Sequence, residues 1–363
     1  MNTLTKSEKF FNTVKLTADD QLFVGVDVHK KSYHVALYLN DAPAMDFVMP
    51  AQKEQLGQKL KPALPALRKI VYETGPTGYG LARHLHNENL PVSVAATSRI
   101  PRAIGSTDKT DRLDSKQLAQ YAAKGLLHPV AIPSLKQEAD RQLYRMRHRQ
   151  ARNLAKVKTQ IKSFLLMHGI DEPGGLSHWS KSSIAALHAI RLSPTLRLSF
   201  DELLGDLEYY LLRVKALDKH LADHLDKGLL SRRMALLKTH PGVGSVVACQ
   251  FATELFHYRD FPSTREVFKY LGLSPRMHQS GERAVKGGIN RVSNSRLRSN
   301  LVQAAWCWVA IDVEAQKCYR RILNNCGGIK QKAIIAMARK LSGHLWTMLT
   351  ENQPYKPIRQ VGN

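Results

Sequence analysis

The stretch LFVGVD at residues 22–27 decides the fold of the first third of this chain. Apolar residues and one glycine lead up to Asp27, and IVYE at residues 70–73 repeats the arrangement with Glu73 at its end. Short apolar runs of this kind are typical of buried strands. We therefore expect two buried strands, each with a carboxylate at or near its end.

Two further acids follow three residues apart in TDRLDSKQLA, residues 110–119. If a helix opens here, this spacing places Asp111 and Asp114 on one face of its first turn. Asp108 stands three residues before Asp111, so spacing alone does not decide which two of the three aspartates act together. Asp114 is also suited to an ordinary role as a helix N-cap.

Four carboxylates crowded together repel one another unless a cation lies between them. Hard oxygen ligands suit Mg²⁺ or Mn²⁺, and two such ions about 3.5–4 Å apart can clamp an in-line phosphoryl displacement. A strand acid, a second strand acid and then a helix with a D-x-x-D pair is the order typical of RNase H-like (RuvC-like) folds. We predict such a domain with Mg²⁺ as its cofactor, Mn²⁺ being the alternative.

The charge of the chain points to a polyanionic partner. Lys and Arg total 54 against 30 acids, which gives a formal charge of +24, and the pI is near 10.0. Nucleic acid is the favoured partner. No long apolar stretch, signal peptide or lipidation motif is present, so we expect a cytoplasmic, nucleoid-associated protein without a membrane partner. The four cysteines lack C-x-x-C spacing, so neither a zinc site nor a disulfide framework is predicted.

The pattern divides the chain into five regions. A polar tail, 1–20, precedes an α/β domain at 21–130, with strands expected at 22–28, 32–39, 69–74 and 91–95 and helices near 52–62 and 77–88. A basic helical region with coiled-coil character follows at 131–235. A mainly α-helical region at 236–349 and a tail at 350–363 complete the chain.

The basic region contains a run of cations without an intervening acid. An exposed helix usually mixes charges of both signs, so this run favours contact with phosphate over a merely solvated face. Leu154, Val157, Ile161 and Phe164 form a coiled-coil-like seam beside it. A second helix near 199–227 is expected to pair with the first as an antiparallel hairpin or with another subunit. The predicted nucleic-acid contacts here are Arg141, Arg145, Arg149, Arg152 and Lys156.

LKTHPGVGS, residues 237–245, resembles the turn of a helix-hairpin-helix element. Gly242 and Gly244 would let the backbone approach phosphate, and the amides that open the next helix would hold the anion. The alternative is a tight turn between helices that binds no ligand.

A candidate nucleophile lies in HQSG, residues 278–281. A serine beside a glycine is commonplace in flexible loops, but cations surround Ser280 in the sequence. An exposed hydroxyl there could attack a phosphodiester whose developing charge the cations stabilise. His278 has no assigned role, and a metal in the acidic site could activate the serine instead. The surrounding cations are Arg283, Lys286, Arg291, Arg296 and Arg298, of which Lys286, Arg291, Arg296 and Arg298 are predicted nucleic-acid contacts.

These motifs together resemble the insertion-sequence-110 family of transposases, the RNA-guided bridge recombinases, which also include Piv-type DNA invertases. Three blocks carry the resemblance: VGVDVHK at 24–30; YETGPTG at 72–78 with KTDRLD at 109–114; and PGVG at 241–244 through LGLSP at 271–275 to Ser280 and Gly281. The segment KAIIAMARKL, 332–341, is similar to the closing helix of that family.

The resemblance implies a D-E-D-D site formed by Asp27, Glu73, Asp111 and Asp114, and a nucleophilic Ser280 in a carboxy-terminal transposase domain. It implies a phosphoserine intermediate, donor and target DNA as substrates, and a structured noncoding bridge RNA that selects them. It further implies a homo-oligomer, a dimer assembling to a tetramer, in which the acidic site of one subunit acts with the serine domain of another. Ser293 departs from the glycine that the family usually has before Asn294.

Two rival functions predict different reaction products. A RuvC-type hydrolytic nuclease would use water, so it would cut DNA without a protein adduct. A non-enzymatic nucleic-acid-binding protein would bind in a salt-dependent way and would keep its binding after loss of Asp27. Transposase and invertase would share one site and differ in the arrangement of the DNA ends.

Overall fold

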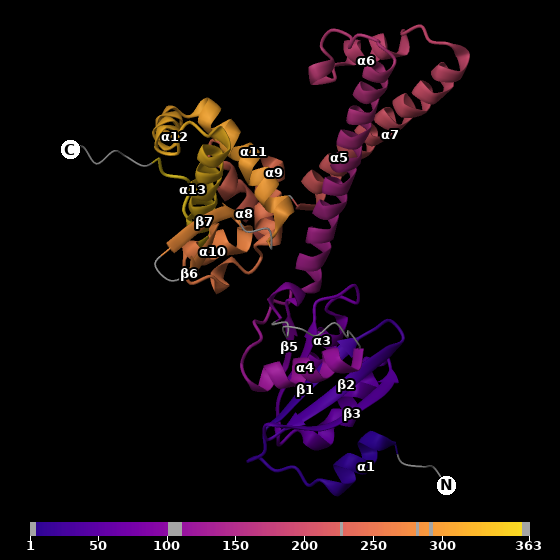
Figure 1. Ribbon diagram of the computed structural model, residues 1–363, viewed down its shortest axis with the longest axis vertical. Coiled ribbons are helices and arrows are strands. Elements are labelled where there is room, and N and C mark those ends of the chain that lie inside the picture. Colours follow the sequence, from indigo (N-terminus) through magenta and orange to yellow (C-terminus); the bar gives the residue numbers. More distant parts are fainter. Residues whose placement is uncertain (1–4, 101–110, 226–227, 281–282, 290–292, 358–363) are drawn as a thin grey trace, which may run out of the picture. The chain divides into compact units, whose positions relative to one another are not determined.

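The computed structural model describes residues 5–100, 111–225, 228–280, 283–289 and 293–357; for Arg99 and residues 111–113, 224–225, 276–280 and 283–287 it describes the backbone alone. The chain divides into two compact units, Met1–Ile132 and Pro133–Asn363. Figure 1 shows a sheet with its helices in the first unit and a mainly helical second unit. None of the helices in the described ranges is long and apolar enough to cross a membrane.

The first unit contains a five-stranded mixed sheet in the order β3-β2-β1-β4-β5. Its strands are β1 (Leu22–Val28), β2 (Ser32–Leu39), β3 (Ala42–Pro50), β4 (Leu67–Glu73) and β5 (Val92–Ala95). The pairs β1–β2 and β2–β3 are antiparallel, whereas β1–β4 and β4–β5 are parallel. This mixed α/β arrangement fits the predicted RNase H-like domain.

Strand β3 is an element that the sequence analysis did not predict. It carries Pro43 and Pro50 and a polar Asp46, so its residues do not form a clean apolar run. Prolines are tolerated on an edge strand, which is where β3 lies. Asn40 and Asp41 join β2 to β3 with φ values of 47° and 63°, the conformation that a tight hairpin favours.

The two faces of the sheet are covered by different helices. Val24, Val26, Ile70 and Tyr72 are fully buried on one face, in a core that includes residues of α2 (Lys53–Leu60) and α3 (Gly80–Asn87). The opposite face packs against α4 (Asp111–Ala123) through a smaller cluster formed by Val71, Ala95, Leu118 and Ala122.

Gly25 allows α4 to lie directly on β1. A Cβ atom at this position would overlap the carbonyl oxygen of Ser115 and would lie 2.6 Å from the backbone nitrogen of Ala119. Both obstacles are backbone atoms of one helix, so they cannot move aside as a side chain could. A glycine in the middle of β1 therefore positions the helix that carries Asp114.

We expect Gly25→Val to lower the free energy of unfolding by about 3 kcal/mol, because α4 must shift away from β1. Urea unfolding followed by circular dichroism measures the change. Gly80→Ala is the matched control, since a Cβ on Gly80 meets no atom within 4 Å. Equal stabilities of the two variants would contradict this account of Gly25.

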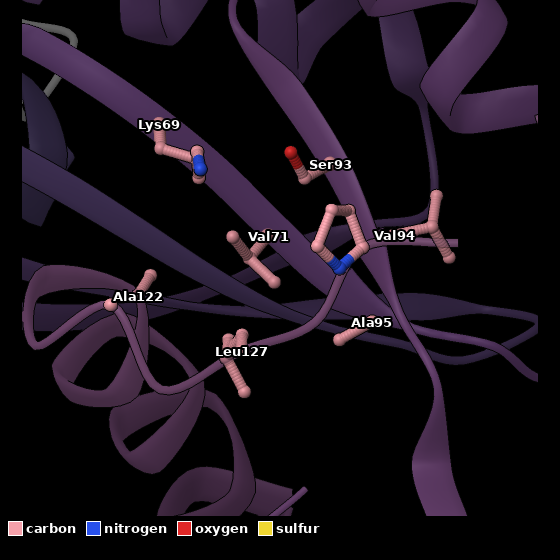
Figure 2. Close-up of a pocket in the computed structure, with 9 residues that line it drawn as sticks. Lys69, Val71, Ser93, Val94, Ala95, Ala122 and Leu127 are labelled. Atoms are coloured by element: carbon pink, nitrogen blue, oxygen red, sulfur yellow. The ribbon is translucent and has the colours of Figure 1, made fainter. Parts of the chain in front are cut away.

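A small hollow lies on the α4 face of the sheet, toward the amino end of β4. Figure 2 shows Lys69, Val71, Ser93 and Ala95 on one side of it, with Ala122 and Leu127 on the other. Its volume is about 30 Å³, enough for a water molecule and far too small for a nucleotide. Glu73, one of the predicted site acids, ends β4 on the other side, so this hollow does not include the predicted site.

The first twenty residues, predicted to be a polar tail, instead contain helix α1 (Lys6–Thr13). Thr5 and Glu8 form a reciprocal capping box at its start, a signal that the sequence already carried. Phe10, Phe11 and Leu16 pack against the core of the sheet.

The second unit begins with two long helices that pack against each other. Helix α5 (Leu135–Met167) and helix α7 (Pro194–Leu225) are connected through α6 (Lys181–His188). Phe164 stacks on Phe200 at 4.8 Å, and Arg147 pairs with Asp218 at 2.8 Å, so the helices run antiparallel. The pairing predicted for this region therefore forms within one chain.

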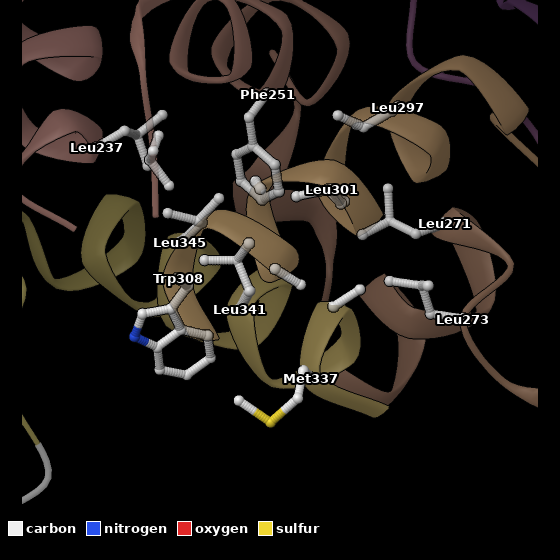
Figure 3. Close-up of a cluster of buried hydrophobic side chains, with 14 of the residues drawn as sticks. Leu237, Phe251, Leu271, Leu273, Leu297, Leu301, Trp308, Met337, Leu341 and Leu345 are labelled. Carbon is white, nitrogen blue, oxygen red and sulfur yellow. The ribbon is translucent and has the colours of Figure 1, made fainter. Parts of the chain in front are cut away.

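The rest of the second unit is a helical domain with one hairpin. Its elements are α8 (Leu229–Lys238), α9 (Ser245–Glu254), α10 (Thr264–Leu271), β6 (Pro275–Ser280), β7 (Arg283–Ile289), α11 (Ser295–Ile311), α12 (Val313–Asn325) and α13 (Lys330–Glu351). Figure 3 shows its core, in which Phe251, Leu301, Leu341 and Leu345 lie together. The boundary predicted between residues 235 and 236 falls inside α8.

Candidate active site

Asp27 and Glu73 lie on the sheet face that α4 covers. Gly25 pairs with Val71 and Val26 with Tyr72 in the parallel β1–β4 register, so the next residues along, Asp27 and Glu73, are neighbours. Alternation along each strand puts Asp27 on the face of Gly25 and Glu73 on the face of Val71. Two carboxylates are thus brought side by side at the carboxyl ends of adjacent strands, as the sequence predicts.

Two histidines that the sequence analysis did not select accompany Asp27. The Nε2 atom of His29 lies 3.0 Å from Oδ2 of Asp27, and Asp27 itself is 8 % exposed. His34 is opposite Asp27 in the β1–β2 register, and its ring meets that of His29 edge-on at 5.6 Å. The contact with His29 restricts the orientation of the Asp27 carboxylate. The sequence feature that could have identified His29 is its position two residues after Asp27, the acid near the end of the predicted strand.

Helix α4 opens at Asp111, so Asp111 and Asp114 both belong to its first turn. Asp114 is half-buried, while the side chain of Asp111 and all of Asp108 lie outside the described residues. Lys116 on α4 pairs with Asp46 on β3 at 3.1 Å, which fixes α4 across the sheet at a second point. The helix therefore presents its D-x-x-D turn on the same face as Asp27 and Glu73.

The acids fit a hard divalent cation in chemistry, because carboxylate oxygens are the ligands that such ions prefer. The parallel register brings the ends of β1 and β4, and with them Asp27 and Glu73, next to each other. Within the described side chains, no group of three or more His, Cys, Asp or Glu is close enough to hold a metal ion. Asp27, Glu73 and Asp114 are among those side chains, whereas Asp111, the fourth predicted ligand, is not.

Ser280 ends strand β6 in a two-stranded hairpin. It pairs with Arg283 at the start of β7, so Ser280 is the last paired residue before the turn of the hairpin. The side chains of Ser280, His278 and Lys286 and the whole of Arg291 lie outside the described residues. The backbone thus places the candidate serine at an end of a paired ribbon rather than within an unstructured loop.

Arg298 clamps the base of this hairpin. Its guanidinium donates to Ser293 Oγ at 2.6 Å and to the carbonyl of Gly272 at 3.5 Å, residues that flank β7 and β6 respectively. Gly272 has φ of +66°, and a Cβ there would lie 2.6 Å from Cβ of Ser293. Asn294 caps α11 by accepting from the amide of Leu297. Arg298, predicted to contact nucleic acid, is thus engaged within the protein.

The predicted turn between α8 and α9 forms, with Gly244 as the N-cap of α9. Packing within the protein explains why residue 242 is a glycine. A Cβ atom there would lie 2.5 Å from Cβ of Trp308 and 2.8 Å from the carbonyl oxygen of Ala304. Gly242 therefore allows α11 to approach the turn, whereas a Cβ on Gly244 meets no atom within 4 Å. The group that lies close to Gly242 is therefore a helix of the protein itself. Contact between Gly244 and a phosphate stays a prediction.

His240 lies buried beneath this turn. Its Nδ1 accepts from the amide of Gly242 at 3.3 Å, and its Nε2 lies 3.2 Å from Nδ1 of His344. Burial, followed by the charge of His344, lowers the pKa of His240 to about 3.

In the unfolded chain the side chain of His240 takes up a proton near pH 6.5, whereas in the folded chain it does so only near pH 3. The stabilisation that depends on neutral His240 is therefore lost as the pH falls from 6.5 toward 3. We expect a loss of about 2 kcal/mol at pH 5 relative to pH 7.5, on the basis of 1.36 kcal/mol per pKa unit. Urea unfolding at both pH values measures it. His240→Asn should reduce the pH dependence and His128→Asn, at an exposed position, should keep it; equal pH dependence in both would be inconsistent with the assignment.

The five cations predicted on α5 divide into two groups. Arg141 is 8 % exposed and stacks over the ring of Phe256, and Arg145 makes a two-point ion pair with buried Glu254 at 2.8 and 2.9 Å. These two support the packing of α5 on the helical domain. Arg149, Arg152 and Lys156 are exposed.

Two family models match the chain. A model of DEDD-type transposases of the IS110 group, described as "Transposase", matches residues 24–169, and one described as "Transposase IS116/IS110/IS902 family" matches residues 234–320. Together they cover more than half of the chain, and they include Asp27, Glu73, Asp111, Asp114 and Ser280. The DEDD-type model suggests dependence on a divalent metal ion in general.

Several curated proteins are similar to most of the chain. The putative transposase y4qE of Sinorhizobium fredii is 28 % identical over 91 % of this chain and 89 % of its own length. The transposase for insertion sequence element IS1328 of Yersinia enterocolitica is 25 % identical over 78 % of this chain and 82 % of its own. The pilin gene-inverting protein of Moraxella bovis is 24 % identical over 80 % and 82 %.

Proposed function

Because the chain belongs to the IS110 family of insertion-sequence transposases, we propose that it cuts and rejoins DNA through a phosphoserine intermediate formed by Ser280. Cleavage of DNA and strand transfer are the activity of this family. The observation that carries the proposal is the position of Ser280 at the end of a paired hairpin whose base Arg298 clamps. A rigid ribbon can present a hydroxyl to a backbone phosphate more consistently than a loose loop can.

The proposed chemistry is a direct exchange at phosphorus. The Oγ atom of Ser280 attacks the phosphodiester, a P–Oγ bond forms as a P–O bond of the DNA breaks, and the serine proton is lost as the released strand end gains one. The new linkage keeps the energy of the phosphodiester, so the released or another strand end can reverse the step and rejoin DNA. Cations beside the hairpin stabilise the charge that develops on phosphate.

We propose that Asp27, Glu73, Asp111 and Asp114 hold Mg²⁺ for this reaction, with Mn²⁺ as a substitute. A bound divalent ion would neutralise phosphate charge and align the attacked group. The neighbouring carboxylates of Asp27 and Glu73 support this assignment, as does the presentation of α4 on the same face. His29 keeps Asp27 oriented for its ligand role.

A structured bridge RNA and a second subunit complete the proposal. The resemblance of the three sequence blocks to the bridge recombinases supports RNA guidance, and the charge of +24 supports binding of both RNA and DNA. In the proposed dimer or tetramer, the acidic site of one subunit acts together with the serine hairpin of another. Transposition, rather than inversion, is supported by the names of most of the relatives.

A denaturing gel tests the proposal. The protein purified with its own RNA is mixed with Mg²⁺ and end-labelled DNA that spans the element junction. The proposed function predicts label that migrates with the denatured protein, and loss of that signal after the RNA is digested. Cut DNA without labelled protein would instead identify a hydrolytic nuclease.

A further inference from the structure

A basic groove lies where the middle helix α5 meets the start of α11. Exposed Arg149, Arg152 and Lys156 line it from α5, and exposed Arg296 lines it from the first turn of α11. Gln142, His148 and Asn153 supply uncharged hydrogen-bonding groups to the same groove. Neither the family models nor the relatives' names assign a role to it.

Within the described residues, the exposed cations of the groove differ from Arg145 and Arg147 in that they form no ion pair with an acid. Glu254 neutralises Arg145, and Asp218 neutralises Arg147. In the described part of the chain, no carboxylate forms an ion pair with Arg149, Arg152, Arg296 or Lys156. Burial and then the charges of Arg296, Arg152 and Arg147 lower the pKa of His148, which lines the same groove.

The spacing of the cations suits a nucleic-acid backbone. Residues 149, 152 and 156 advance by three and four, which places their side chains along one face of α5. At 1.5 Å per residue they span roughly 10 Å, close to three steps of a DNA strand at about 3.4 Å per step. Several positive side chains in a row, with neutral polar groups in the same groove, are suited to phosphates and sugars rather than to base edges.

The groove is connected to the base of the serine hairpin. Asn294, which caps α11, donates to Glu254 at 3.3 Å, and Glu254 in turn holds Arg145 of α5. Asn300 links the same helices by donating to Tyr144 and to Gln250. Strand β7 has seven residues, so the tip of the hairpin is roughly 20 Å along the ribbon from its base. At about 3.4 Å per step, a DNA strand that follows the ribbon covers this length in roughly six nucleotides.

We propose that this groove binds the sugar-phosphate backbone of the DNA strand that Ser280 attacks. The inference rests on the proposed function of Ser280. It adds a binding surface for the attacked strand on the same unit of the protein. DNA is favoured over RNA because α11, which carries Arg296, is the element that follows the serine hairpin in the chain.

Full-length Arg149→Ala, Arg152→Ala and Arg296→Ala test the groove. Each should weaken binding of a short labelled junction DNA by about tenfold in fluorescence anisotropy. Each should also lower the slope of log affinity against log salt by about one. Adduct formation should fall at limiting DNA and recover at saturating DNA. Arg320→Ala, an exposed arginine on α12, is the matched control and should change none of these.

The outcomes separate the groove from the serine. Variants that behave like Arg320→Ala would overturn the inference, and so would variants that lose affinity for the copurified RNA while keeping affinity for DNA. If the groove variants lose DNA affinity but the wild-type protein forms no adduct, the proposed role of Ser280 fails and the groove stands as a DNA site alone. Weaker DNA binding together with a wild-type adduct supports both.

Discussion

Replacing Ser280 by alanine is expected to eliminate the covalent protein–DNA adduct and to lower strand transfer by at least about a thousandfold, the scale on which loss of a nucleophile acts. Binding of DNA should stay within about twofold of wild type, because one hydroxyl adds little to a phosphate-dominated interaction. Label transfer on a denaturing gel and anisotropy with the same DNA measure the two quantities.

The control for this prediction is another serine in the same domain. Ser299→Ala changes an exposed hydroxyl on α11, a helix that begins just after the hairpin, and should leave the adduct unchanged. Thermal unfolding should be the same for both variants and wild type. An adduct that persists in Ser280→Ala at wild-type level would mean that another residue is the nucleophile.

Asp27→Asn is expected to lower DNA cleavage and adduct formation by at least about a hundredfold at saturating Mg²⁺. The amide keeps the size of the side chain and its place beside His29, but it removes the negative charge that a divalent cation needs. The effect should persist when Mg²⁺ is raised tenfold, and DNA binding should remain. Cleavage against metal concentration, with the anisotropy assay beside it, measures the outcome.

Asp19→Asn is the matched control, since Asp19 is an exposed acid in the segment before β1. It should cleave like wild type at every Mg²⁺ concentration. Unchanged cleavage by Asp27→Asn would exclude Asp27 as a ligand, and full activity of the wild type in a chelator would exclude the metal itself.

The sequence was most informative where the interactions are local. The bounds of β1 and β2 coincide with the predicted 22–28 and 32–39, because buried strands carry a run of apolar residues. The acids at the strand ends and the first turn of α4 followed from the same periodicity. Strand β3 escaped prediction because an edge strand needs neither continuous apolar residues nor freedom from proline.

Contacts between distant residues could not be read from the sequence. The run of cations on α5 contains no acid, yet Arg145 pairs with Glu254, 109 positions later in the chain. The close approach of α11 to Gly242 likewise depends on how helices pack, and glycine in a turn gives the same sequence signal for a protein neighbour as for a phosphate. Periodicity therefore predicted the faces of these helices but not their partners.

Mapping the attachment site in the wild-type protein tests the central claim most directly. The adduct formed with Mg²⁺, copurified RNA and junction DNA is denatured, digested with protease and nuclease, and sequenced by mass spectrometry. We predict a single modified peptide, with a nucleotide joined through phosphate to Ser280. A nucleotide on any other residue, or cleaved DNA with no modified peptide, would contradict the claim.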